Sequence, residues 1–196
     1  METWISFTLL AVVMQSVRTA GQKQIATKVS AQAATLVRYL FGLPFALIYF
    51  YWLQSGHAIA EKLSPTFFVS SSLAAVSQIA ATVLLIKALS LKNFAVGTAL
   101  AKTEAILTAA LGSLFFCAGL NLLGYFSVFL GVAGVLLASN LRVSWTDFTT
   151  NKSIKFGVGA GLGFALASLW IREASLSLGI DGVVSAATVL VFMVIL

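Results

Sequence analysis

The stretch that decides the fold is residues 94–116, which read FAVGTALAKTEAILTAALGSLFF and carry charge only near the centre, at Lys102 and Glu104. About 20 helical residues cross a hydrocarbon core about 30 Å thick, so this stretch is long enough to span a bilayer. A charged side chain at that depth costs roughly 3 kcal/mol on insertion scales, and such residues by default face a bundle interior or a wet transport pathway. We therefore expect a membrane protein that moves a solute, with Lys102 and Glu104 at its binding site.

The composition of the whole chain agrees with this expectation. Hydrophobic residues make up 60% of the 196 residues, charged residues 9%, and the mean hydropathy is +1.01. A soluble domain carries about 25% charged residues, so a water-soluble fold is disfavoured. The net charge is +6, but the twelve Lys and Arg residues are dispersed among apolar runs. Without a basic block interleaved with aromatic residues, no nucleic-acid partner is expected.

Residues that would support metal or hydrolytic chemistry are scarce. Cys117 is the single cysteine and His57 the single histidine, so a zinc-type ligand set cannot be assembled from them. Neither Gly-x-Ser-x-Gly nor His-Glu-x-x-His occurs. The sequence therefore predicts no enzyme, no metal and no cofactor. Residues before the apolar run 5–14 include Glu2 but no Lys or Arg, the wrong charge for a signal peptide, so we expect a retained first span.

Seven candidate spans follow from the apolar runs, and strict apolar/polar alternation is absent, so helices are expected rather than a barrel. Pro65 suits the first turn of a helix, and Pro44 should kink the second span because it removes a backbone hydrogen bond. The predicted spans are residues 4–24, 33–53, 65–89, 94–116, 120–139, 154–178 and a seventh that begins near 183.

Basic residues alternate between the connections of this predicted bundle. They are concentrated around the first, third and fifth connections, which the positive-inside rule places in the cytoplasm, with the N-terminus outside. This orientation stays open, because some of the residues counted for the first connection fall inside the first span. The residues counted are Arg18, Lys23, Lys28, Lys87, Lys92, Arg142, Lys152 and Lys155.

The end of the chain and an internal similarity suggest a repeat. SVRTA at 16–20 precedes AATLV at 33–37, and WIREA at 170–174 precedes AATVL at 186–190 at nearly the same spacing. If the repeat is real, its period holds five helices, and an odd number inverts the second copy. We predict an all-α polytopic membrane protein with about seven transmembrane helices. Residues 1–139 would form one complete five-helix repeat, 140–153 a connecting loop, and 154–196 the start of an inverted second repeat, apparently truncated at its C-terminus.

Polar side chains inside the spans are the candidate binding residues. Gln15, Arg18 and Gln22 form a stripe at helical spacing that faces either a cavity or the headgroups. Arg38 is read as an anchor whose side chain reaches the headgroups. Lys102 and Glu104 are two residues apart, so they point about 200° apart and cannot pair directly, and each needs another partner or water. For Glu104 the structural alternative to a binding role is an ion pair with Arg18 or Arg38.

Two later spans add further candidates. Gln78 shares a face with Ser71 and Thr82, for which hydrogen bonding between helices is the simple explanation. Glycines at 157, 159, 161 and 163 form overlapping Gly-x-x-x-Gly pairs, which predict tight helix packing. Arg172 lies late in the sixth span. The predicted substrate- or proton-binding residues are Glu104, Lys102, Arg18, Gln15, Gln22, Gln78 and Arg172.

Several of these segments resemble EamA-like transporters of the drug/metabolite transporter superfamily. Residues 87–90 (KALS), 96–100 (VGTAL) and 102–105 (KTEA) resemble the third-to-fourth helix region of that family, and residues 131–137 and 38–44, with Arg18 and Gln22-Lys23, resemble other helices. The resemblance implies ten helices in two inverted halves, a cavity lined by the first, third and fourth helices, and an N-terminus inside. Residues 116–119 read FCAG where the family often has Gly-Glu, and helices eight to ten are absent from this chain.

The function that this resemblance implies is secondary transport of small organic metabolites or drugs across the bacterial inner membrane. Export is the expected direction. The alternative is a non-transporting helical subunit or an inactive truncated fragment. The expected partners are a small-molecule substrate and the lipid bilayer, with a homodimer as one way to supply missing helices.

Overall fold

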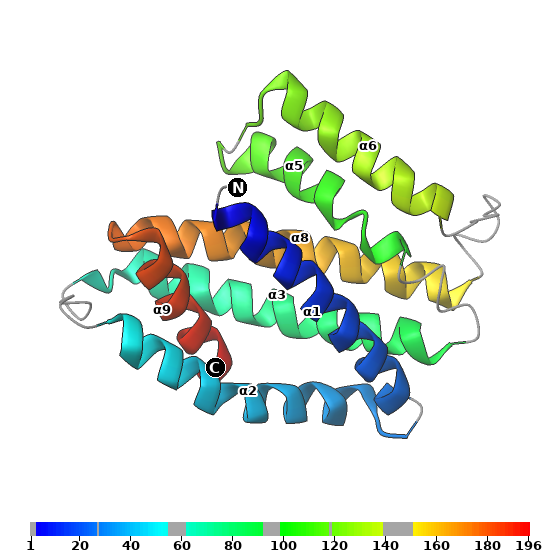
Figure 1. The fold of residues 1–196 in the computed structure, drawn as a ribbon, viewed down its shortest axis with the longest axis horizontal. Coiled ribbons are helices and arrows are strands. Elements are labelled where there is room, and N and C mark those ends of the chain that lie inside the picture. Colours follow the sequence, from blue (N-terminus) through cyan, green and yellow to red (C-terminus); the bar gives the residue numbers. More distant parts are fainter. Residues whose placement is uncertain (1–2, 27, 55–61, 92–98, 118, 139–150) are drawn as a thin grey trace.

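Within the residues that the structure describes, the protein forms seven helices (Figure 1). The computed structural model describes residues 3–26, 28–54, 62–91, 99–117, 119–138 and 151–196, and no strand occurs within these ranges. All seven predicted spans correspond to a helix, which confirms the all-α prediction. The helices are α1 (Thr3–Ala26), α2 (Ala31–Leu53), α3 (Pro65–Ser90), α5 (Glu104–Phe115), α6 (Leu122–Ala138), α8 (Lys152–Leu178) and α9 (Gly182–Ile195).

Local sequence signals set the helix ends close to the predicted boundaries. The Ser64 Oγ accepts a hydrogen bond from the Phe67 N–H at 3.2 Å, with Pro65 at the first helical position of α3. The Asp181 carboxylate accepts from the Val183 N–H at 2.9 Å and caps α9. Gly179 ends α8 in the left-handed conformation, with φ of 59°. Pro44 lies inside α2, whose ribbon changes direction about half-way along (Figure 1).

The centre of the bundle is the antiparallel pair α3 and α8, which make the most extensive contact of any two helices described (Figure 1). The predicted tight packing of the α8 glycines is confirmed. A Cβ on Gly163 would lie 2.9 Å from the Ala81 Cβ and 3.3 Å from the Ser77 carbonyl oxygen, so only a glycine fits without a shift. A Cβ on Gly159 would lie 3.1 Å from Leu84. Small residues therefore bring the two backbones together.

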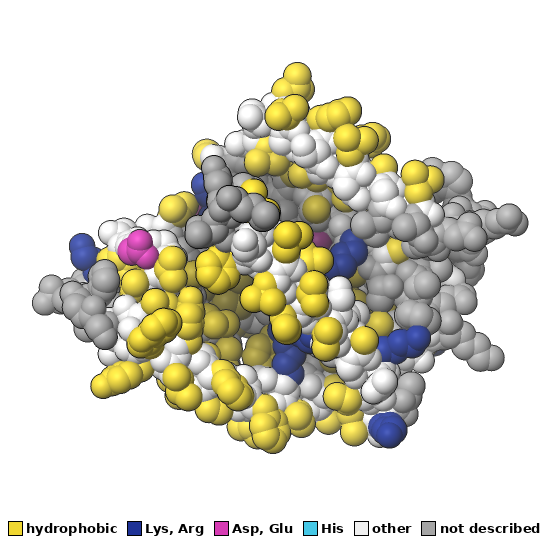
Figure 2. All heavy atoms as spheres, in the orientation of Figure 1, with side chains coloured by type: hydrophobic (Ala, Val, Ile, Leu, Met, Phe, Trp, Pro, Cys, Tyr) yellow, Lys and Arg dark blue, Asp and Glu magenta, His cyan; other side chains and the backbone are white. Residues whose placement is uncertain are grey.

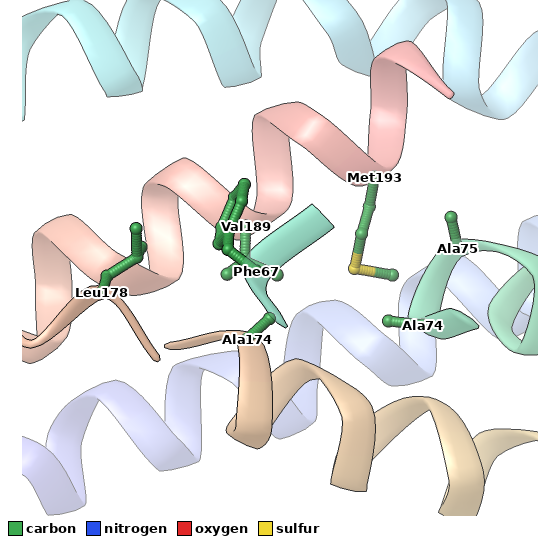
Figure 3. Close-up of a cluster of buried hydrophobic side chains, with 7 residues drawn as sticks. All are labelled: Phe67, Ala74, Ala75, Ala174, Leu178, Val189 and Met193. Atoms are coloured by element: carbon green, nitrogen blue, oxygen red, sulfur yellow. The ribbon is translucent and has the colours of Figure 1, made fainter. Parts of the chain in front are cut away.

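A cluster of buried side chains joins α3, α8 and α9 at one end of this pair. Phe67 and Val189 lie within it, and the Phe67 ring packs edge-on against Phe192 with centroids 5.3 Å apart. Figure 3 shows these side chains converging between the three helices. The cluster fixes α9 against the central pair. Its buried members are Phe67, Ala74, Ala75, Ala174, Leu178, Val189 and Met193.

The outer surface is apolar, as expected of a chain in lipid. α2, α3 and α8 are each long and apolar enough to cross a membrane, and α6 and α9 are shorter apolar helices. Large apolar side chains on α2, including Phe45 and Trp52, are more than 70% exposed. Figure 2 shows hydrophobic side chains over most of α2 and α9 on the face in view. Patches of this extent on a helical chain mark contact with a membrane.

Candidate functional site

The predicted fourth span is interrupted at the residues that decided the fold. Residues 92–98 lie outside the described part of the chain, Ala99 to Ala101 are helical, Lys102 and Thr103 form a turn, and α5 begins at Glu104. At the turn the Lys102 N–H donates to the Ala99 carbonyl and the Thr103 N–H to the Leu100 carbonyl, each at 3.0 Å. These bonds span three residues instead of the four of an α-helix. The helix is therefore tightened just before Glu104.

A glycine of α8 packs directly on this turn. A Cβ on Gly161 would lie 3.2 Å from both the Leu100 carbonyl oxygen and the Thr103 Oγ1. The Thr103 hydroxyl itself donates to the Leu100 carbonyl at 2.7 Å. The turn is thus held from within by Thr103 and from outside by the close approach of α8.

The interruption corrects the prediction for the two central charges. Lys102 and Glu104 were expected to point about 200° apart on one helix, but both line the same cavity. The reason is the turn at Lys102 and Thr103, which breaks the regular helical rotation between the two side chains. The two charges therefore border the same cavity.

This cavity, called here the central cavity, has a volume of about 280 Å³ and lies between α1, α3, α5 and α8. Its lining includes five of the seven predicted site residues, so the polar stripe of α1 faces a cavity and not only the helix end. Leu85, Phe164 and Ile171 provide apolar walls. The five predicted residues are Gln15, Arg18, Gln78, Lys102 and Glu104.

Ser168 is a polar lining residue that the sequence did not single out. Its hydroxyl donates a hydrogen bond to Glu104 Oε1 at 3.3 Å from the facing helix α8. Phe164, Ser168 and Ile171 line the cavity at spacings of four and three, so they form one stripe of α8. A serine on this stripe, within an otherwise apolar span, is the sequence signal from which Ser168 could have been predicted as a lining residue. The hydrogen-bond partner of Glu104 given by the structure is a hydroxyl and not an arginine.

A smaller cavity adjoins the central cavity between α1 and α2 and is called here the arginine cavity. Its volume is about 230 Å³, and its lining includes Arg18, Gln22 and Arg38. Arg18 lines both cavities. Gln22 was a predicted site residue and lies in this second volume.

The interpretation of Arg38 as a headgroup anchor is wrong. Its Nη1 donates to the Thr82 Oγ1 of α3 at 3.2 Å, and its guanidinium lies 5.1 Å from the centre of the Tyr39 ring. The side chain is half-buried and turned into the bundle, because α3 offers a hydroxyl there. The expectation that Thr82 bonds between helices is confirmed by the same contact.

Arg172 is the one predicted site residue that the structure does not bring to either cavity. Its side chain is exposed on α8. The neighbouring Glu173 lies along a separate, mainly apolar cavity beside Trp170. The matching arginines of the internal similarity, Arg18 and Arg172, therefore have different surroundings.

No group of three or more His, Cys, Asp or Glu side chains in the described ranges comes close enough to hold a metal ion. His57 and residues 140–150 of the predicted connecting loop lie outside those ranges. The lining of the central cavity offers hydrogen-bonding groups and charge, from Gln15, Arg18, Gln78, Lys102, Glu104 and Ser168.

The comparisons with known proteins point to one family. The model of the EamA-like transporter family matches residues 2–140, which covers well over half of the chain and all of α1 to α6. A comparison with curated proteins and with solved structures gives no match. Together with the apolar helices and the charged central cavity, this match shows an integral membrane protein of the drug/metabolite transporter type, and the chain belongs to the EamA-like transporter family.

Proposed function

We propose that this protein is a secondary transporter of small organic metabolites, working as an exporter across the bacterial cytoplasmic membrane. The observation that carries the proposal is the central cavity, in which Lys102, Arg18 and Glu104 line about 280 Å³ among apolar helices. Charged side chains at membrane depth are rare and mark substrate or ion pathways. The volume lies near the lower end for ligand pockets, which favours a small metabolite.

Glu104 is proposed as the residue on which transport depends most. Its carboxylate lies in the first turn of α5, lines the cavity and accepts a hydrogen bond from Ser168. A carboxylate in that position is able to bind a proton or a cationic group of the substrate. Ser168 would position it, because a hydroxyl on the facing helix restricts the rotation of the side chain.

The alternative of a non-transporting subunit predicts that Glu104 is a structural ion-pair partner of Arg18 or Arg38. The described contacts favour the first reading, because Glu104 bonds to Ser168 while Arg38 bonds to Thr82. A carboxylate with a purely structural role would also not explain why Glu104 borders the central cavity.

The test is uptake and binding by the purified chain in liposomes. A panel of amino acids, organic acids, nucleobases, sugars and amines is screened by radiolabel flux and by thermal stabilisation. Glu104→Gln keeps the shape of the side chain and should abolish flux while the folded yield stays at the wild-type level. Glu173→Gln is the matched control, a half-buried carboxylate on α8 outside the central cavity.

Three outcomes would count against the proposal. Equal saturable flux in Glu104→Gln and wild type would remove Glu104 from the pathway. A chain that neither binds nor moves any compound of the panel would contradict transport itself. A loss of folded yield in Glu104→Gln that is restored by neutralising Arg18 or Arg38 would identify a structural ion pair.

A further inference from the structure

We propose that Arg18 and Arg38 form a site for the acidic group of the substrate, so that the transported solute is a small organic anion bearing a carboxylate or phosphate. This inference rests on the proposed function and assigns its substrate class. It starts from the arginine cavity, whose lining residues, all within described helices, include two arginines and no Asp or Glu.

The balance of charge around the two adjoining cavities calls for an anion. The central cavity has Arg18 and Lys102 against one carboxylate, Glu104, and the arginine cavity adds Arg38. Three basic side chains therefore face a single acidic one along the described linings. A charge inside a membrane bundle is stabilised by a partner of opposite sign, and a bound anion would supply the missing one.

Some N–H donors of the two arginines have no hydrogen-bond partner among the residues that the structure describes. Arg18 Nε, a hydrogen-bond donor, is buried without a hydrogen-bond partner. The bond from Arg38 to Thr82 uses one of the five N–H donors of that guanidinium. Guanidinium groups bind carboxylate and phosphate oxygens through paired N–H donors, so Arg18 and Arg38, which both border the mostly apolar arginine cavity, could together bind one acidic group.

The depth of the pair favours a solute over a lipid headgroup. Arg18 lies eight residues before Ala26, the end of α1, and Arg38 lies seven residues after Ala31, the start of α2. At 1.5 Å per residue both are about 11–12 Å from the same end of the bundle. Thr82 lies eight residues before Ser90, the end of α3, so it is at a similar depth. α2, which is long and apolar enough to cross a membrane, has 23 residues and is about 35 Å long, so with α2 centred across a 30 Å hydrocarbon core Arg38 would lie about 8 Å inside it.

Arg18, the lining residue that the two cavities share, gives the anion a position relative to the transport residues. Arg18 lines both volumes, so an acidic group bound between Arg18 and Arg38 would leave the rest of the molecule beside Gln15, Lys102 and Glu104. A donor group on the substrate could then reach the Glu104 carboxylate. The arrangement selects a molecule with an acidic end and a polar body.

The test compares probes of equal length and different charge. Glutarate, glutaramide and 1,5-diaminopentane share a five-carbon chain, and inorganic phosphate and glycerol 3-phosphate provide phosphate groups. Thermal stabilisation of the full chain in neutral-lipid nanodiscs is measured up to about 10 mM, which saturates a site of millimolar affinity. Glutarate or a phosphate compound should stabilise the protein, and the diamine and the diamide should not.

Variants assign the effect to the arginines. Arg18→Gln and Arg38→Gln should each weaken anion affinity about 10- to 100-fold, whereas Arg18→Lys and Arg38→Lys should retain part of it. Lys155→Gln is the control, because it removes one positive charge from an exposed residue that lines neither cavity. The thermal stability of each variant without ligand is measured in parallel and compared with that of the wild type, so that a folding defect is recognised.

The inference is overturned if no anion of the panel stabilises the protein, if the diamine is preferred, or if both glutamine variants bind anions as the wild type does. Stabilisation by phosphatidylglycerol that soluble anions fail to reproduce would assign the site to lipid headgroups and also overturn it. Failure of the proposed function looks different. Anions would then bind through Arg18 and Arg38 without any flux, whereas flux of neutral or cationic compounds that depends on Glu104 would leave transport standing without this substrate class.

Discussion

The contact between α3 and α8 makes Gly163→Ala a sharp test of the packing. The new Cβ would lie 2.9 Å from the Ala81 Cβ and 3.2 Å from its Cα. Carbon atoms pack best at about 3.5–4.0 Å, so the helices would have to separate by about 0.6–1.1 Å. Overpacking of this kind costs about 1–3 kcal/mol, while alanine gains about 1 kcal/mol over glycine as a helix former.

The control isolates the packing term from the helix-propensity term. A Cβ on Gly131 of α6 meets no atom within 4 Å, so Gly131→Ala adds helix propensity without a clash. Unfolding is measured in mixed micelles with increasing SDS and followed by circular dichroism. The free energy of unfolding of Gly163→Ala should be about 1–3 kcal/mol lower than that of Gly131→Ala.

A second substitution tests the named contact. Ala81→Gly removes the atom at 2.9 Å, so the double variant Gly163→Ala, Ala81→Gly should recover about 1 kcal/mol beyond the sum of the single effects. If Gly163→Ala is as stable as Gly131→Ala, or if Ala81→Gly gives no recovery, the close approach of α3 and α8 is not what the glycine provides.

Three further outcomes are expected. Ser168→Ala should lower saturable flux about tenfold without loss of folded protein, because it removes the hydroxyl bonded to Glu104, and wild-type flux would refute a positioning role. Phe67→Ala should cost about 3–5 kcal/mol in SDS unfolding, since this fully buried ring contacts Phe192, and a loss below about 1 kcal/mol would contradict the packing of that cluster. The basic residues predict that Cys117, exposed beside α5, lies outside the cell, so an impermeant maleimide should label intact cells, and labelling only after lysis would reverse the orientation.

The helices were predictable because each depends on its own stretch of sequence. Apolar runs of bilayer length predicted α1, α2, α3, α6 and α8, and Pro65 marked the start of α3 within one residue. Capping groups act over two or three residues, so they too are visible locally. The polar residues of the central cavity were also visible, since few polar side chains occur inside apolar spans.

The structural features that the sequence did not predict depend on contacts between helices. The turn at Lys102 and Thr103 is packed against Gly161, which lies some sixty residues away in the chain. The sequence of residues 99–104 alone does not predict this turn. Arg38 turns inward because Thr82 is at its depth on α3. Ser168 is one of several serines in apolar helices, and only the packing of α8 on α5 makes it the partner of Glu104.

The shared depth of Arg18 and Arg38 has an electrical consequence. A charge that enters from that end of the bundle and stops about 8 Å inside a 30 Å core would have crossed about 0.3 of the membrane voltage. Moving one elementary charge across 100 mV is worth about 2.3 kcal/mol, so a monoanion held between the arginines would gain or lose about 0.7 kcal/mol per 100 mV. Its occupancy at low concentration would then change about threefold for each 100 mV, and the resting potential of the cell would set how full the site is.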